Sequence, residues 1–229
     1  MKFKIAALLI CFIFMNNLKL QALVPKFQKP LVSKVIAIDP GHGGYDPGAT
    51  WGKLKEKEIN LAMAKMLKAN LEAKGAKVIL TRDGDYNHAI KGLHGLEAKR
   101  YDLKQRIDLV HSSKADILLT IHVNSSKNTN SAGAETFYHP KSQQGKILAE
   151  AIQEELRKVP GMKKRIAKQS TFYMLRNTKI PAVLVEIGYL SNARERNNLQ
   201  KESYLMTLTE KITQGIINYF ASKKINEAR

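Results

Sequence analysis

The sequence predicts an α/β protein with one folded domain, whose mostly parallel central sheet of about six strands has helices on both faces. Short apolar segments rich in Val and Ile alternate with segments of helical periodicity, and glycines separate the two kinds. This strand–helix–strand order implies parallel strands with right-handed crossovers. The length of 229 residues and the hydrophobic content of 44% suit a single domain with a full core.

Residues 1–22 have the pattern of a signal peptide or an N-terminal membrane anchor. Two lysines precede eleven apolar residues from Ile5 to Met15, and a polar segment ends at Ala22. This run is shorter than the roughly 20 residues of an ordinary membrane span. We therefore expect export across the cytoplasmic membrane, with the chain either membrane-anchored or secreted. The only cysteine, Cys11, lies in this run, so the exported part offers neither a disulfide nor a thiolate ligand.

The rest of the chain divides into a tether at 23–33 with two prolines, a folded domain at 34–222 and a polar tail at 223–229. The formal net charge of +18 predicts attraction to polyanions. An anionic wall polymer or a membrane surface fits an exported protein, whereas nucleic acid does not.

The folded domain begins with a buried strand at Val35–Ile38 that ends before Pro40, which has no N–H for a sheet. His42 follows among glycines, which we expect to leave open space around its imidazole. Residues 45–54 read as a polar loop, and an apolar stripe at helical spacing runs from Glu56 to Gly75.

Hydrophobic periodicity predicts the remaining elements. Strands are expected at Val78–Leu80, Ile117–Ile121, Ala134–Tyr138, Phe172–Leu175 and Ala182–Gly188. Helices are expected at Leu103–Val110, Lys146–Arg157, Asn192–Leu199 and 203–221, and an extended loop at Asp85–Tyr101.

Two of these strands end in a histidine, His42 or His122, and a third contains Glu186 among apolar neighbours. Ligands of open α/β sheets gather at the carboxyl ends of strands, and a lone buried carboxylate needs a partner or a cation. Two histidines and one glutamate with an open position form a catalytic zinc arrangement. Glu56 or Glu58 could also reach this edge, and their spacing does not decide between them.

The other histidines and three arginines have more ordinary interpretations. His88, His94, His111 and His139 are expected in loops or on helix surfaces, without a metal. Arg82, Arg106 and Arg176 could each bind a substrate carboxylate with two hydrogen bonds, although Arg106 on a helix favours a packing role.

Four sequence blocks, at 39–44, 56–61, 121–125 and 181–192, resemble the zinc-dependent N-acetylmuramoyl-L-alanine amidases of the type 3 amidase family. The resemblance covers about Val35 to Phe220. It implies one Zn²⁺ per chain with His42, Glu56 and His122 as ligands, and thus Glu56 in preference to Glu58. It also implies that Glu186 is the catalytic base and not a ligand.

The resemblance implies hydrolysis of the amide between the lactyl group of N-acetylmuramic acid and L-alanine in peptidoglycan. Within the family the chain looks most like the spore-cortex, germination-related amidases, and an activating protein partner is compatible with that role. Asn124 and Arg176 are expected substrate contacts, and Asp39 is expected either to orient a ligand imidazole or to cap the turn. The alternatives are another zinc peptidase acting on stem peptides and a non-catalytic protein that binds the wall or other polyanions.

Overall fold

A computed structural model describes residues 29–227, so the predicted signal peptide or anchor and most of the tether lie outside the described residues. Within residues 29–227, six strands form one sheet in the order β4-β1-β5-β8-β6-β7. They are β1 (Val35–Pro40), β4 (Lys77–Leu80), β5 (Ile117–Asn124), β6 (Glu135–Tyr138), β7 (Lys168–Gln169) and β8 (Ala182–Tyr189). The first four strands of that order are parallel, and β6 is antiparallel to β8. The mostly parallel sheet that the sequence predicts is confirmed.

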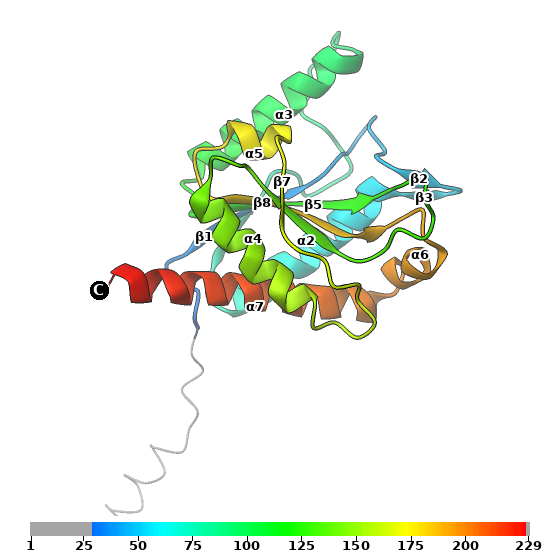
Figure 1. Ribbon diagram of the computed structural model, residues 1–229. Helices are drawn as coiled ribbons and strands as arrows, with labels where there is room; N and C mark the ends of the chain where they lie inside the picture. The colour runs from blue at the N-terminus through cyan, green and yellow to red at the C-terminus, as the bar shows by residue number, and fades with distance from the viewer. Residues whose placement is uncertain (1–28, 228–229) are drawn as a thin grey trace, which may run out of the picture.

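Helices cover both faces of this sheet (Figure 1). One face packs against α2 (Glu56–Ala73), α4 (Gln143–Leu156) and α7 (Glu202–Glu227), and the largest apolar core lies there. The other face packs against α3 (Gly95–Ser112) and α5 (Tyr173–Asn177) over a smaller core. The last helix, α6 (Ala193–Leu199), follows β8. No helix of residues 29–227 is long and apolar enough to cross a membrane.

Several segments differ from the sequence prediction. The predicted loop at Asp85–Tyr101 is helical from Gly95 onward, because α3 begins there. Between Gly95 and Tyr101 only Ala98 is buried, so this first part of the helix lacks the apolar stripe by which sequence reasoning finds helices. The next buried residue, Asp102, is polar and forms an ion pair with Arg106 one turn further on. The predicted strand at Phe172–Leu175 is instead the start of α5, since a run of four apolar residues does not distinguish strand from helix.

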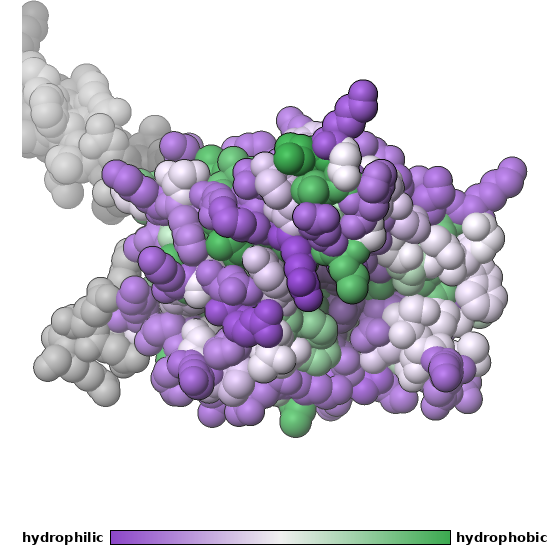
Figure 2. Space-filling view, turned by 90° about the horizontal axis from the view of Figure 1, so that it is seen from above, coloured by the Kyte–Doolittle hydropathy of each residue, from purple (hydrophilic) through white to green (hydrophobic). Residues whose placement is uncertain are grey.

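The predicted loop at 45–54 contains a small hairpin, in which β2 (Thr50–Trp51) pairs with β3 (Leu54–Lys55) immediately before α2. β5 is longer than predicted and contains His122 and Asn124 within the strand. The surface seen in Figure 2 is mainly hydrophilic, with apolar side chains in small separate areas. Charged residues make up 25% of the sequence, an ordinary share for a globular protein.

Candidate metal centre

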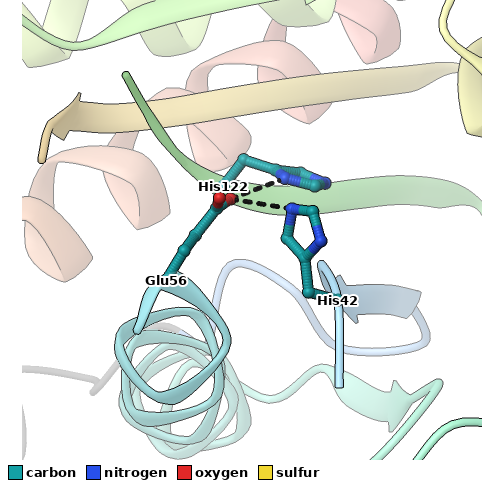
Figure 3. A group of neighbouring side chains, drawn as sticks. All are labelled: His42, Glu56 and His122. Atoms are coloured by element: carbon teal, nitrogen blue, oxygen red, sulfur yellow. Dashed lines mark hydrogen bonds and ion pairs between the residues drawn. The ribbon is translucent and has the colours of Figure 1, made fainter. Parts of the chain in front are cut away.

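Three elements bring two imidazoles and one carboxylate together at the carboxyl ends of the strands (Figure 3). His42 lies in the loop after β1, Glu56 is the first residue of α2, and His122 lies on β5. One ligand atom from each residue lies within 4.8 Å of the others. The imidazole rings meet edge to face with centroids 4.9 Å apart. Sequence spacing alone predicted the two histidines at this edge.

The Glu56 carboxylate is held by both imidazoles and by the backbone. Its Oε1 lies 3.2 Å from Nε2 of His42 and 2.9 Å from Nδ1 of His122. The amide of Ala49 donates to Oε2 at 2.8 Å, and the amide of Val123 donates to Oε1 at 3.0 Å. Burial raises the pKa of Glu56, but its contacts with His122 and His42 outweigh burial and hold the pKa well below its usual range. The carboxylate is therefore ionised and fixed in orientation.

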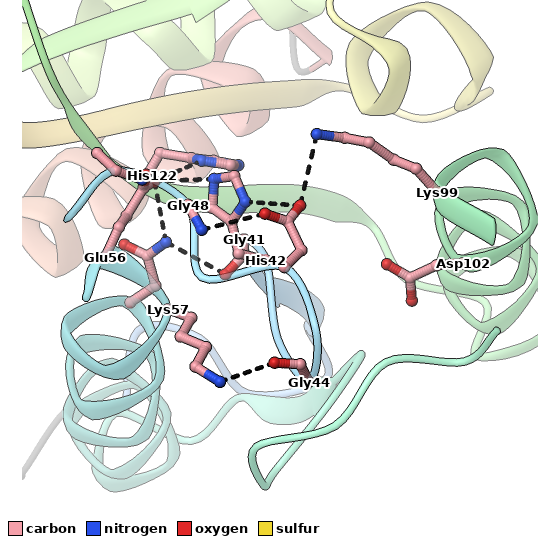
Figure 4. A network of polar contacts seen from close by, with 12 residues as sticks. Gly41, His42, Gly44, Gly48, Glu56, Lys57, Lys99, Asp102 and His122 are labelled. Atoms are coloured by element: carbon pink, nitrogen blue, oxygen red, sulfur yellow. Dashed lines mark hydrogen bonds and ion pairs between the residues drawn. The ribbon is translucent and has the colours of Figure 1, made fainter. Parts of the chain in front are cut away.

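Asp46 is a site residue that sequence reasoning missed. Its Oδ2 lies 2.9 Å from Nδ1 of His42, on the opposite side of the ring from Glu56. Lys99 approaches the same oxygen at 3.4 Å, and the amide of Gly48 donates to Oδ1 (Figure 4). Burial lowers the pKa of His42, but Asp46 and Glu56 outweigh it and raise the pKa to about 9. The signal in the sequence is an aspartate four residues after the histidine, within the same loop.

The glycines around His42 pack tightly against the site instead of leaving open space. A Cβ atom on Gly41 would lie 2.2 Å from Cε1 of His122. A Cβ atom on Gly48 would lie 2.5 Å from Oε2 of Glu56, and the backbone there has a φ of +68°. No side chain larger than hydrogen fits at either position without a shift of these groups.

Two buried arginines shape the loop that carries His42. Arg82 donates hydrogen bonds to the carbonyl oxygens of Pro40 and Gly41 at 2.9 Å. Arg106 donates to Pro40 at 2.9 Å and to the carbonyl of His42 at 2.7 Å. His42 has a φ of 65°, a left-handed conformation that few residues other than glycine adopt, and these bonds hold it there. Both guanidinium groups are 1% exposed, so neither is free to bind a substrate carboxylate.

Asp39 belongs to the same buried network. It accepts hydrogen bonds from Thr81, Thr120 and Arg106, so it anchors the end of β1. Burial raises the pKa of this carboxyl, but Arg106 and the two hydroxyls outweigh it and lower the pKa. The hydrogen bonds of Asp39 thus go to this network, and the carboxylate beside the His42 imidazole is that of Asp46.

Glu186 lies beside His122, because β8 and β5 are paired in that register. Its Oε2 is buried and has no hydrogen-bond partner among the described residues. Burial raises the pKa of Glu186 to about 7. A cavity of about 260 Å³ is lined by Glu186, His42 and His122, together with Phe172 and Tyr173 from the start of α5. Glu186 and both imidazoles therefore line one cavity.

The remaining predicted residues lie outside this cluster. Glu58 is exposed and forms an ion pair with Lys55 at 3.8 Å, away from the imidazoles. Asn124 ends β5, where its Oδ1 accepts from the amide of Ser125. Arg176 on α5 lines a separate cavity. Among the described residues, the candidate metal group contains none of the other histidines, which are His88, His94, His111 and His139.

Fold and site together define an α/β enzyme with a candidate metal-binding set of two histidines and one glutamate. The family model described as N-acetylmuramoyl-L-alanine amidase matches residues 36–218. The chain belongs to this family, and its enzymatic activity is that of an N-acetylmuramoyl-L-alanine amidase. The resemblance found in the four sequence blocks is confirmed.

Known relatives extend the comparison over most of the chain. It is 38% identical over 196 residues to the germination-specific N-acetylmuramoyl-L-alanine amidase of Bacillus subtilis, covering 85% of this chain and 83% of that protein. The CwlD amidase from Clostridioides difficile has been solved in complex with the GerS lipoprotein. Its sequence is 35% identical to this chain, and the two structures superpose with a TM-score of 0.80 over 83% of this chain and 100% of the matched chain. The catalytic domain of CwlV from Bacillus (Paenibacillus) polymyxa is also 35% identical, with a TM-score of 0.70, covering 82% of this chain and 98% of that domain.

Proposed function

We propose that this amidase depends on one Zn²⁺ ion bound by His42, Glu56 and His122. The observation that carries the proposal is the convergence of two imidazoles and one ionised carboxylate, within 4.8 Å of one another, beside Glu186, whose Oε2 is buried without a hydrogen-bond partner among the described residues. This donor set is that of catalytic zinc sites, which keep one position open. Zinc bound there supplies a Lewis acid that activates water and polarises the amide carbonyl.

Glu186 is the proposed general base. Its buried Oε2 has no competing hydrogen bond among the described residues, and Glu186 lines the same cavity as both imidazoles. A pKa of about 7 suits a group that takes a proton from the attacking water and returns it to the departing amine of L-alanine. Water adds to the lactyl carbonyl carbon, the C–N bond breaks, and the proton held by Glu186 completes the leaving amine.

We place Asp46 in a supporting role, because it contacts the nitrogen of His42 that faces away from Glu56. Carboxylates in this position fix the orientation of ligand imidazoles and raise their basicity. Asn124 and Arg176 remain proposed substrate contacts, although neither lines the cavity that the imidazoles line.

Spore cortex maturation is the proposed setting, supported by the similarity to the germination-specific amidase of Bacillus subtilis. Residues 1–22 would direct export or anchor the protein in the membrane, and the net charge of +18 would favour anionic wall polymers or a membrane surface. The solved complex of CwlD with the GerS lipoprotein supports the proposal that this chain also binds a protein partner, and we propose an activating role for that partner.

Digestion of purified peptidoglycan tests the zinc-dependent mechanism. The untreated enzyme is expected to release whole peptides that begin with L-alanine, identified by mass spectrometry, and to leave the glycan intact. A chelator should abolish release, and added Zn²⁺ should restore it. Activity that persists in a protein shown by elemental analysis to be metal-free would refute the zinc proposal, whereas release of single terminal amino acids would indicate a carboxypeptidase.

The Glu186→Gln variant tests the general base. We expect activity to fall by about 100-fold or more, with zinc content unchanged, because the amide cannot accept the proton. Full activity in this variant would show that another group accepts the proton. Loss of zinc would instead place Glu186 among the metal ligands.

A further inference from the structure

Trp51 is the only tryptophan of the chain and lies in the β2–β3 hairpin next to the metal centre. Within this hairpin Trp51 pairs with Leu54, and Thr50 pairs with Lys55, the residue before Glu56. The amide of Ala49 donates to the Glu56 carboxylate. A strand rises about 3.3 Å per residue, so the backbone of Trp51 lies within roughly 7 Å of that bond.

The indole is 48% exposed, although tryptophan side chains are usually largely buried. One face of the ring is occupied, because the guanidinium carbon of Arg196 lies 4.1 Å from the ring centroid. That distance is well within the range of a cation–π contact. With Trp51 48% exposed in spite of this contact, part of its ring surface stays open to solvent. The hairpin and α6, which carries Arg196, lie at the same end of the sheet (Figure 1).

Hydrogen bonds connect Arg196 to the strand that carries His122. Its Nη1 donates to the carbonyl of Leu190 at 2.9 Å, and the amide of Leu190 donates to the carbonyl of Asn124 at 2.7 Å. Asn124 lies two residues after His122 on β5. The exposed ring is therefore held at a fixed place relative to the metal centre, which favours a binding role over a mobile surface side chain.

We propose that Trp51 is a substrate-contacting residue whose open ring face stacks on a sugar ring of the peptidoglycan glycan strand. Sugar rings present patches of C–H groups that pack flat on aromatic faces, whereas a stem peptide of small and acidic residues offers no such flat surface. The scissile amide joins the peptide directly to a sugar, so the glycan must pass the rim of the metal centre. This assignment rests on the proposed function in placing the scissile amide at the metal centre.

Intrinsic fluorescence tests the assignment directly, since Trp51 is the only source of tryptophan emission in the protein. The probe is a peptide-free oligosaccharide of N-acetylglucosamine and N-acetylmuramic acid, which contains no scissile amide. We expect a saturable change in emission with this probe and none with a free stem peptide. No response to the oligosaccharide, or an equal response to the peptide, would overturn the proposal. The readout requires no hydrolysis, so its failure is distinct from failure of the zinc mechanism.

Kinetics of the Trp51→Ala variant provide a second test. We expect KM for peptidoglycan to rise about tenfold, comparable to the loss of one aromatic stacking contact, with kcat within about twofold. Trp51→Phe should recover most of the affinity, because a smaller aromatic face remains. Met206→Ala on α7, 42% exposed, is the control and should change neither parameter. A lower Tm with unchanged KM would overturn the proposal and give Trp51 a purely structural role.

Discussion

Replacing Asp39 with asparagine removes the negative charge from the buried network beneath the His42 loop. Asp39 is 1% exposed and accepts three hydrogen bonds, from Thr81 at 2.5 Å, Thr120 at 2.8 Å and Arg106 at 3.0 Å. Asparagine has nearly the same shape but leaves the guanidinium of Arg106 without one of its counter-charges. The variant therefore tests the charge of Asp39 and leaves the packing almost unchanged.

The expected loss in free energy of unfolding depends on the ion pair that Arg106 keeps in the variant. Breaking a buried ion pair costs about 3–5 kcal/mol in free energy of unfolding, because the remaining charge stays buried. Arg106 keeps Asp102, with Nη2 to Oδ2 at 3.0 Å, so we expect about 3 kcal/mol. Asp108→Asn is the matched control on the same helix, since Asp108 pairs with Lys104 in solvent. Its loss should stay below about 1 kcal/mol.

Urea unfolding of the two variants and the unmodified protein, followed by circular dichroism, measures these differences. The pKa of Asp39 is lower in the folded protein than in the unfolded chain, where it is near 3.8. Its contribution is therefore complete above that unfolded value and is lost as the pH falls through the folded value. The difference in free energy of unfolding between Asp39→Asn and the unmodified protein should stay constant from pH 7 to pH 5. Equal losses in the two variants, or a gap that narrows above pH 5, would refute this reasoning.

Further predictions concern the metal centre. Gly48→Ala should lose zinc with the fold retained, because its Cβ would meet the Glu56 carboxylate at 2.5 Å. Gly52→Ala is the control, since Gly52 has a similar φ of +58° and nothing within 4 Å of the added Cβ. Equal zinc content in the two variants would contradict this prediction. Glu56→Gln should abolish stoichiometric zinc binding while Glu58→Gln retains it, measured by elemental analysis; the reverse pattern would exchange their roles. Asp46→Asn should weaken zinc affinity by about 10–100-fold in competition with a chelator, and unchanged affinity would remove Asp46 from the site.

Much of the fold and the centre of the site could be predicted because apolar periodicity signals them. The strands that carry His42, His122 and Glu186 are short apolar runs, and parallel strands present their carboxyl ends at one edge. Spacing could not separate Glu56 from Glu58, since both belong to the first turn of α2. The family resemblance favoured Glu56, and the structure places its carboxylate against both imidazoles.

The features that escaped prediction depend on buried polar contacts between distant segments. The N-terminal part of α3 has little apolar periodicity, because Ala98 is its only buried residue before Asp102, which forms an ion pair with Arg106. Arg82 looked like a candidate for substrate binding, yet its hydrogen bonds go to backbone carbonyls in the His42 loop. Contacts of this kind can be identified only from the three-dimensional structure, because no periodic pattern in the sequence indicates them.

The hydrogen bonds from Arg82 and Arg106 to the carbonyls of the His42 loop have a consequence for the order of maturation. The loop takes its shape from the chain's own bonds, so folding does not have to wait for the metal, unlike the case of zinc fingers. A chain exported unfolded can fold first and acquire its ion afterwards from the surroundings. For the zinc-dependent, exported enzyme proposed above, metal supply outside the cell would be a reversible control on when the enzyme works, without any loss of folded protein.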